Sequence, residues 1–239
     1  MEKKGRLQMK TESIFDQLYG VPLFKSLTLE EMKPVINIAS VKTYTPGMHV
    51  FLQGEELKNV YFIHHGKVKI YKTDLNGKEQ IVNVLQAGDM FPHAGFFRQD
   101  SCPAHAEIIE NVTLIYIPII LFEHFLIQHP EVCIKLFRVL GDKIVDLQVR
   151  LEEQIFHNSF EQIMMLLLRL SKVYGKPTNG GEKVTLTTNF TNRELANMIG
   201  TSRETVSRTL TQLKKNNIVL VNSNGEITID TVALETQLF

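Results

Sequence analysis

Residues 191–215 of the chain read Thr-Asn-Arg-Glu-Leu-Ala-Asn-Met-Ile-Gly-Thr-Ser-Arg-Glu-Thr-Val-Ser-Arg-Thr-Leu-Thr-Gln-Leu-Lys-Lys. Thr191 and Glu194 have the spacing of a capping box, in which each side chain bonds the backbone N–H of the other residue, so a helix is expected to begin there. Gly200 stands where the chain must turn sharply, because glycine enters the positive-φ region without steric cost. The stretch therefore predicts two helices joined by a tight turn, a helix-turn-helix.

The second helix of this motif, expected to begin at Thr201 or Ser202, has one apolar and one polar face. Val206, Leu210 and Leu213 form the apolar face, and the polar face carries Arg203, Glu204, Ser207 and Arg208. In a major groove, arginine can donate two hydrogen bonds to guanine and glutamate can accept one from cytosine N4. An ordinary helical hairpin with solvated charges is the alternative. The capping box, the glycine turn and the polar face together favour DNA recognition.

The segments on either side of the motif predict a wing. Ser159 is expected to cap a helix from Phe160 to Tyr174, and the polar turn 175–181 and a short strand at 184–187 follow. At the end of the chain, residues 219–221 and 227–229 predict a hairpin that closes around Asn224-Gly225. Residues 158–239 therefore predict a winged helix-turn-helix domain.

A helix with a continuous apolar seam is predicted ahead of this domain. From Cys133 onward, apolar residues follow a 4-3-4-3-4 spacing at Phe137, Leu140, Ile144, Leu147 and Leu151. This is the a/d pattern of a two-stranded coiled coil, so residues 128–157 are interpreted as a dimerisation helix. A core helix without a partner is the alternative, but the seam is longer than packing on one small domain requires.

Short strands are predicted before the helix. Six glycines, spaced 7 to 12 residues apart, divide residues 40–120 into short apolar or alternating runs. Asn76-Gly77 lies between two such runs and predicts a hairpin. The pattern indicates an antiparallel, jelly-roll-like β-roll. The fold class is thus α+β: an N-terminal extension over 1–22, a sensor-like β-roll over 23–127, the dimerisation helix over 128–157 and the winged helix-turn-helix over 158–239.

Composition limits the classes of protein that fit. The chain has 239 residues, 44% of them hydrophobic, which is typical of a globular protein. Its 2 cysteines cannot supply a disulfide scaffold or a four-thiolate cluster. We see no apolar stretch long enough to span a bilayer. We therefore expect a cytoplasmic protein without membrane, metal or cofactor.

The net charge is zero, from 26 Lys+Arg and 26 Asp+Glu, but the two signs are not evenly spread. Residues 158–239 hold nine Lys+Arg and seven Asp+Glu, a net of +2, whereas residues 1–157 hold 17 and 19, a net of −2. A net of +2 is small for phosphate binding, so affinity for arbitrary DNA is expected to be weak and salt-dependent.

From about Leu23 to Leu238 the chain resembles the Crp/Fnr family of bacterial transcription regulators. Gly200-Thr-Ser-Arg-Glu-Thr-Val-Ser-Arg208 is similar to the recognition-helix signature of that family. The resemblance implies a homodimer that binds a palindromic operator with TGTGA-like half-sites on double-stranded DNA. It also implies that the dimer activates or represses transcription in contact with RNA polymerase. It further implies base contacts by Arg203, Glu204, Ser207 and Arg208, and phosphate contacts by Thr191, Ser202 and Thr205.

The resemblance also sets expectations for the β-roll, where residues 88–106 align with the phosphate-binding cassette of cyclic-nucleotide binders. Pro92-His93 stands in place of the Gly-Glu pair that holds the ribose, and Pro103-Ala104 in place of the Arg-Ser or Arg-Ala pair that holds the phosphate. Leu147-Gln148 replaces the Thr-Ser pair that contacts adenine. Without its arginine the site lacks a charge-assisted clamp, so we do not expect cyclic AMP to bind. An iron–sulfur cluster is not expected either, since the extension 1–22 has no cysteine.

Several signals stay open. A thiol switch could use Cys102, on a predicted polar loop, or Cys133. Haem or metal could bind histidines such as His64 and His65, although an adjacent pair on a strand would point to opposite faces. A small organic or anionic effector could occupy a remodelled pocket, or there could be no effector. The candidate residues for that pocket are His93, Pro103, Ala104, His105, Leu147 and Gln148.

Two other functions are alternatives to DNA-binding regulation. A metal-dependent, cupin-like enzyme would use the β-roll for catalysis, and a regulatory subunit would use it to bind another protein. In a dimeric regulator, an effector would tilt the DNA-binding domains about a hinge near His157-Asn158-Ser159.

Overall fold

The computed structural model describes residues 14–25, 27–97, 101–178 and 183–238. Its internal contacts divide the chain into two compact units, Met1–Ile144 and Val145–Phe239, each of which is described by itself. The division falls within the long helix α4 (Pro130–Phe156). Of the helices in the described residues, none is both long and apolar enough to cross a membrane.

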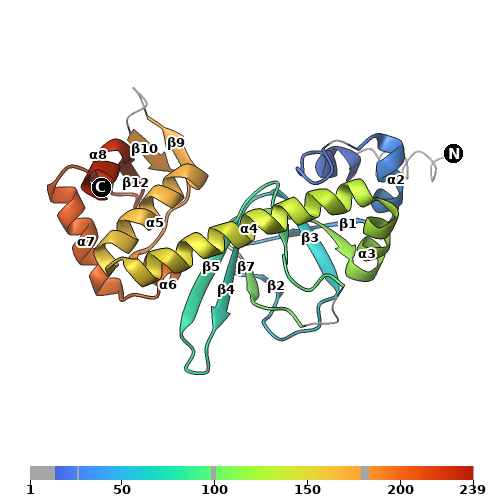
Figure 1. The fold of residues 1–239 in the computed structure, drawn as a ribbon, viewed down its shortest axis with the longest axis horizontal. Coiled ribbons are helices and arrows are strands. Elements are labelled where there is room, and N and C mark those ends of the chain that lie inside the picture. Colours follow the sequence, from blue (N-terminus) through green and yellow to red (C-terminus); the bar gives the residue numbers. More distant parts are fainter. Residues whose placement is uncertain (1–13, 26, 98–100, 179–182, 239) are drawn as a thin grey trace. The chain divides into compact units, whose positions relative to one another are not determined.

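The described part of the first unit contains two four-stranded antiparallel sheets (Figure 1). One sheet has the strand order β1-β8-β3-β6 and the other has the order β2-β7-β4-β5. The strands are β1 (Ser40–Tyr44), β2 (His49–Phe51), β3 (Asn59–His65), β4 (Val68–Thr73), β5 (Glu79–Leu85), β6 (Met90–Phe91), β7 (His105–Ile108) and β8 (Val112–Pro118). The predicted antiparallel β-roll is confirmed.

Strands β3 and β8 are buried on both faces, which explains why their sequences read as nearly continuous apolar runs. Along β3, Val60 and Phe62 pack with the helices of this unit, whereas Tyr61 and Ile63 face the interior of the roll. These helices are α2 (Leu29–Ile38), α3 (Ile119–Gln128) and the start of α4. Alternate residues of one strand thus join two cores, because successive side chains point to opposite faces of a sheet.

The second unit is a winged helix-turn-helix, as predicted. Its sheet has the order β11-β12-β10-β9, and β11 and β12 form the hairpin around Gly225, which has a φ of 81°. After the end of α4, the elements are α5 (Ser159–Tyr174), β9 (Gly175–Pro177), β10 (Lys183–Leu186), α6 (Asn192–Ile199), α7 (Arg203–Lys215), β11 (Val219–Val221), β12 (Ile227–Asp230) and α8 (Thr231–Leu238).

Three details of this unit differ from the sequence prediction. The N-cap of α5 is Asn158 and not Ser159, because the Asn158 side chain accepts from the N–H groups of Phe160 and Glu161 while Glu161 bonds back to Asn158. Residues 175–177 form a strand that pairs with β10 instead of a turn. Helix α8 was not predicted, and its buried Leu234 packs it into the unit.

Two glycines of the first unit have left-handed backbones in very different surroundings. Gly66 has a φ of 88°, and a Cβ atom there would lie 2.2 Å from the carbonyl oxygen of Asn111 and 2.8 Å from the Cα of Val112. Gly77, in the predicted β4–β5 hairpin, has a φ of 78° and open space around it.

We expect Gly66→Ala to lower the free energy of unfolding by at least about 3 kcal/mol, because backbone strain and overlap with Asn111 combine. Gly77→Ala is the matched control and should cost only about 1–2 kcal/mol, the strain of a left-handed alanine. Urea unfolding followed by circular dichroism measures both losses. Equal losses would contradict the close approach at Gly66.

Candidate nucleic-acid interface

The first helix of the motif begins at the predicted capping box. Thr191 is the N-cap of α6: its Oγ1 accepts from the N–H of Glu194 at 3.2 Å, and its own N–H donates to Glu194 Oε2 at 2.8 Å. Leu195, Ala196 and Ile199 form the buried face of α6. The capping box therefore fixes both the start of α6 and the face that it turns to the core.

The turn after α6 depends on glycine. Gly200 has a φ of 74°, and its N–H donates to the carbonyl of Ala196, so the helix ends in a left-handed residue. Ser202 then caps α7 by accepting from the N–H of Thr205 at 3.1 Å. Helix α7 therefore begins at Arg203, not at Thr201 or Ser202 as the sequence predicted.

The exposed face of α7 carries two arginines with free guanidinium groups. Val206, Leu210 and Leu213 are buried, while Arg203, Glu204, Ser207 and Arg208 are exposed. Among the described residues, neither Arg203 nor Arg208 forms an ion pair, in contrast to Arg150 with Asp146 and Arg169 with Glu153. The guanidinium groups are thus available to an external acceptor.

Glu204 is held in its ionised form. The backbone N–H of Glu204 itself and the side chain of Ser202 lower the pKa of its carboxyl group, and the charges of Arg203 and Arg208 add to this effect. The first turn of α7 therefore presents acceptor and donor groups side by side, as base-edge recognition requires.

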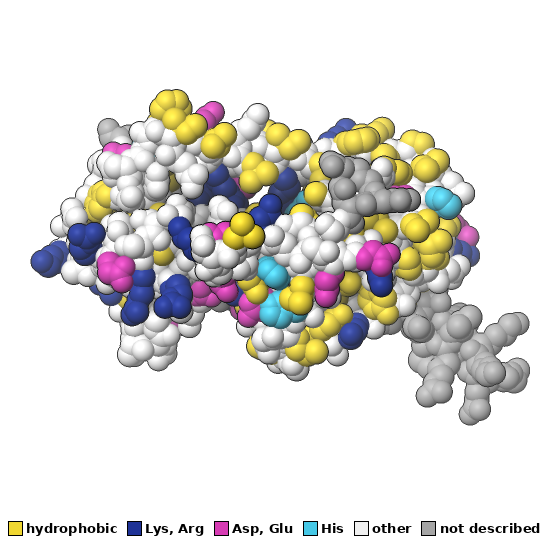
Figure 2. All heavy atoms as spheres, turned by 90° about the horizontal axis from the view of Figure 1, so that it is seen from below, with side chains coloured by type: hydrophobic (Ala, Val, Ile, Leu, Met, Phe, Trp, Pro, Cys, Tyr) yellow, Lys and Arg dark blue, Asp and Glu magenta, His cyan; other side chains and the backbone are white. Residues whose placement is uncertain are grey.

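The residues predicted to contact phosphates lie at helix N-termini. Thr191 and Ser202 are exposed N-caps of α6 and α7, and Thr205 is half-buried in the first turn of α7. The N-terminus of a helix favours anions because its first N–H groups are unpaired and its dipole is positive there. On the face that Figure 2 shows, the Lys and Arg side chains lie in small groups.

Four of the six effector-pocket candidates lie in the first unit and two in the second. Burial, with a smaller effect of the Lys143 charge, lowers the pKa of His93 to about 4. His105 lies on β7, where its ring stacks on Tyr71 at 4.7 Å and its Nδ1 accepts from the N–H of Gln53 at 3.2 Å. Ala104 is buried and Pro103 is exposed. Leu147 and Gln148 are exposed on α4, within the second unit.

Sequence reasoning missed Lys143. The positive charge of this residue of α4 lowers the pKa values of both Asp89 and His93. At Asp89 it opposes burial, which raises the pKa, and at His93 it adds to burial, which lowers the pKa. Nothing in the spacing of a helix indicates which of its lysines faces a loop some fifty residues earlier, so no local signal could have identified it.

The two cysteines are free thiols that differ in burial. Cys102 lies in the segment between β6 and β7, outside the strands as expected, but it is only 2% exposed, and burial raises the pKa of its thiol. Cys133 is half-buried. His64 and His65 are both exposed, at a point where the register of β3 shifts. Among the described residues, no three His, Cys, Asp or Glu side chains are grouped to hold a metal ion.

The predicted seam of α4 is exposed. Phe137, Ile144, Leu147 and Leu151 are 67%, 58%, 54% and 57% exposed, and Leu140 is half-buried. By contrast, Val132 and Leu136 on the adjoining face are buried in the first unit. An apolar stripe of this length left in water is a mark of an interaction surface.

The low pKa of His93 makes stability depend on pH. The unfolded chain protonates this imidazole as the pH falls through its ordinary pKa of 6.5, whereas the folded protein does so only near 4. Stability is therefore lost between these pH values, by about 2 kcal/mol on going from pH 7 to 5. Urea unfolding at the two pH values should show this loss shrinking in His93→Gln but not in His124→Gln, an exposed control. If the loss of unfolding free energy between pH 7 and 5 were the same in His93→Gln as in the wild-type protein, His93 would not be its source.

Comparison with known proteins gives matches in both units. A family model described as a cyclic nucleotide-binding domain matches residues 41–129, and one described as a Crp-like helix-turn-helix domain matches residues 161–236. The chain is 25% identical over 217 residues to the global nitrogen regulator of Synechocystis sp., covering 90% of this chain and 93% of that protein. It is 26% identical over 200 residues to the cyclic AMP receptor protein of Thermus thermophilus, covering 84% and 88%.

A solved structure shares the fold. A CooA mutant from Carboxydothermus hydrogenoformans superimposes with a TM-score of 0.74 at 21% identity, covering 92% of this chain and 95% of that one. The curated relatives are transcription regulators, which excludes the cupin-like enzyme considered as an alternative. With a cyclic nucleotide-binding-like β-roll followed by a Crp-like helix-turn-helix, the chain belongs to the Crp/Fnr family of transcription regulators.

Proposed function

We propose that the protein is a homodimer that recognises a palindromic DNA operator with TGTGA-like half-sites and regulates transcription in the cytoplasm. The observation that carries the proposal is the N-terminal half of α7, where Arg203 and Arg208, which form no ion pair among the described residues, lie with the ionised Glu204 on an exposed face. Each α7 enters one major groove, and the two grooves lie ~34–36 Å apart on one side of the duplex.

Arg203, Glu204 and Arg208 carry sequence discrimination, with Ser207 beside them. Thr191, Ser202 and Thr205 hold the helix ends against phosphates, which sets the register of α7 but carries no sequence information. A regulatory subunit that binds only protein would have no use for this face, so the observation favours DNA.

The dimer forms through α4. Four seam residues that are more than half exposed would each remove apolar surface from water when two α4 helices pair. Their a/d spacing fits a parallel two-stranded coiled coil, which places the two DNA-binding units on one side of the dimer.

The signal sensed by the β-roll is not cyclic AMP, although relatives are named for it. Pro103-Ala104 supplies no guanidinium for a phosphate, and Leu147-Gln148 replaces the polar pair expected for adenine. A small anionic effector near His93 and Lys143 fits the described groups better than a switch at buried Cys102. RNA polymerase is the expected protein partner, and the position of the operator decides between activation and repression.

Arg203→Ala should relax the preference at one G·C pair and cost about 1–3 kcal/mol of binding, because a bidentate contact to guanine is lost. The operator is first selected from random DNA, and binding of each variant is then measured on that site and on single-base changes. Arg193→Ala, an exposed arginine of α6, is the matched control and should keep the base preference. An equal loss with Arg203→Ala on all sequences would refute a base contact.

Ile144→Asp should convert the dimer into a monomer, because each partner would bring a carboxylate into the apolar seam. Arg138→Asp places the same group on an exposed position of α4 away from the seam and should leave the dimer intact. Analytical ultracentrifugation reports the mass of each variant. A dimeric Ile144→Asp protein would show that another surface holds the subunits together.

A further inference from the structure

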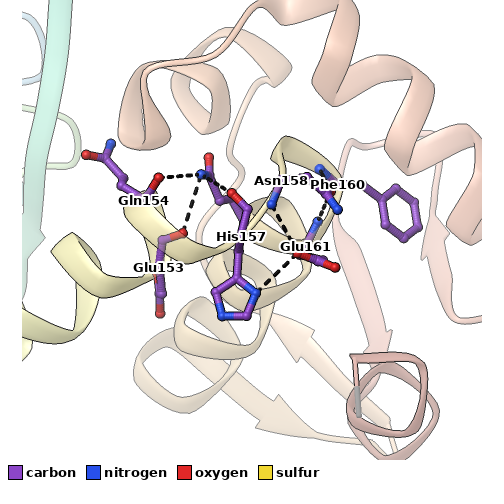
Figure 3. Close-up of polar contacts among 7 residues, drawn as sticks. Glu153, Gln154, His157, Asn158, Phe160 and Glu161 are labelled. Atoms are coloured by element: carbon purple, nitrogen blue, oxygen red, sulfur yellow. Dashed lines mark hydrogen bonds and ion pairs between the residues drawn. The ribbon is translucent and has the colours of Figure 1, made fainter.

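The junction between α4 and α5 is closed by polar contacts from both sides (Figure 3). The side-chain amide of Gln162 donates to the carbonyl groups of Glu153, Gln154 and His157, at 3.4, 3.4 and 2.8 Å. Glu153 and Gln154 lie in the last turn of α4 and His157 directly follows it; the Glu153 carbonyl also accepts from the N–H of His157 at 3.2 Å. Asn158 caps the start of α5 as described above. These hydrogen bonds therefore join the last turn of α4 to the first turn of α5.

Two further contacts tie the last turns of α4 to the body of the DNA-binding unit. Glu153 accepts two hydrogen bonds from Arg169 of α5, at 2.6 and 2.9 Å, with only 16% and 19% of the two side chains exposed. Gln154 donates from Nε2 to the carbonyl oxygen of Ile199 at 3.4 Å. Ile199 is the last residue of α6 and immediately precedes the Gly200 turn. The end of α4 is therefore bonded to the helix-turn-helix itself.

We propose that Glu153 and Gln154 are positioning residues for operator recognition, which fix the helix-turn-helix to the end of α4. The proposal rests on the proposed function, a dimer paired along α4 and bound to a palindrome. In such a dimer, a rigid attachment at Glu153 and Gln154 sets both the separation and the rotational phase of the two α7 helices. The segment Val145–Phe156 then moves with α7 as one body.

This attachment bears on the hinge that the sequence suggested between α4 and α5. The sequence suggested a hinge near His157-Asn158-Ser159, but this is where the bonds of Gln162 and Asn158 are concentrated. In the proposed dimer these bonds would oppose bending at the junction.

The spacing between the half-sites provides the test. One added base pair shifts a half-site by ~3.4 Å and rotates it by ~34–36°, so a rigid dimer cannot engage both half-sites of a mis-spaced operator. Loss of the second contact removes the avidity gained by two-site binding, about 100-fold or more. A dimer with loosened attachments would follow the altered spacing.

Binding is measured for the full-length dimer on the selected operator, on versions with one base pair removed or added between the half-sites, and on a single half-site. For the wild-type protein we expect a loss of about 100-fold on changed spacing. For Glu153→Gln and Gln154→Met we expect that loss to fall below about tenfold, because each weakened attachment lets α7 reorient. Affinity for the single half-site should be unchanged in both variants. Glu152→Gln makes the same charge change at the exposed neighbouring residue and should behave like the wild type.

An unchanged spacing profile in both variants would overturn the positioning role. An equal loss on every DNA, the single half-site included, would also overturn it, because that result indicates a structural defect in the DNA-binding unit. If the wild-type protein bound the palindrome no better than the half-site, the proposed dimeric function itself would fail, and the spacing inference with it. Ultracentrifugation of each variant confirms that the dimer is intact before binding is compared.

Discussion

A helix leaves the N–H groups of its first turn and the carbonyls of its last turn without partners, and the placement of the recognition helix depends on how side chains satisfy them. Thr191 and Ser202 cap α6 and α7, and Gly200 closes the end of α6. Gln162 satisfies the end of α4. Because each cap fixes the angle at which one helix enters the next, these short polar contacts orient the exposed face of α7.

Local patterns predicted the features that local physics decides. The capping box at Thr191, the glycine turn at Gly200 and the hairpin at Asn76-Gly77 each depend on a few neighbouring residues, and all are present. The start of α5 was misplaced by one residue because Asn158 and Ser159 are both good caps, and each has a capping-box partner three residues later, Glu161 or Gln162; in the structure Glu161 bonds Asn158, whereas Gln162 bonds carbonyls at the end of α4.

What the sequence did not predict depends on contacts between distant segments. The burial of Cys102 arises from its place among strands of the roll, which its polar neighbours conceal. The effect of Lys143 on His93 joins a helix to a loop, and the bond from Gln154 to Ile199 joins residues 45 positions apart. Neither pairing leaves a periodic signal, so the sequence identified the exposed polar face of α7 but not the contacts that hold it in place.

The ionised Glu204 between Arg203 and Arg208 has a consequence for how the protein searches DNA. In the proposed function the carboxylate accepts a hydrogen bond from cytosine on the cognate sequence, whereas a guanine or thymine at that position would offer it only acceptors, beside the negative field of the backbone. Together with the small net charge of residues 158–239, this shortens the dwell time on wrong sites. A regulator built in this way leaves incorrect sites quickly, so few molecules are held on the rest of the genome.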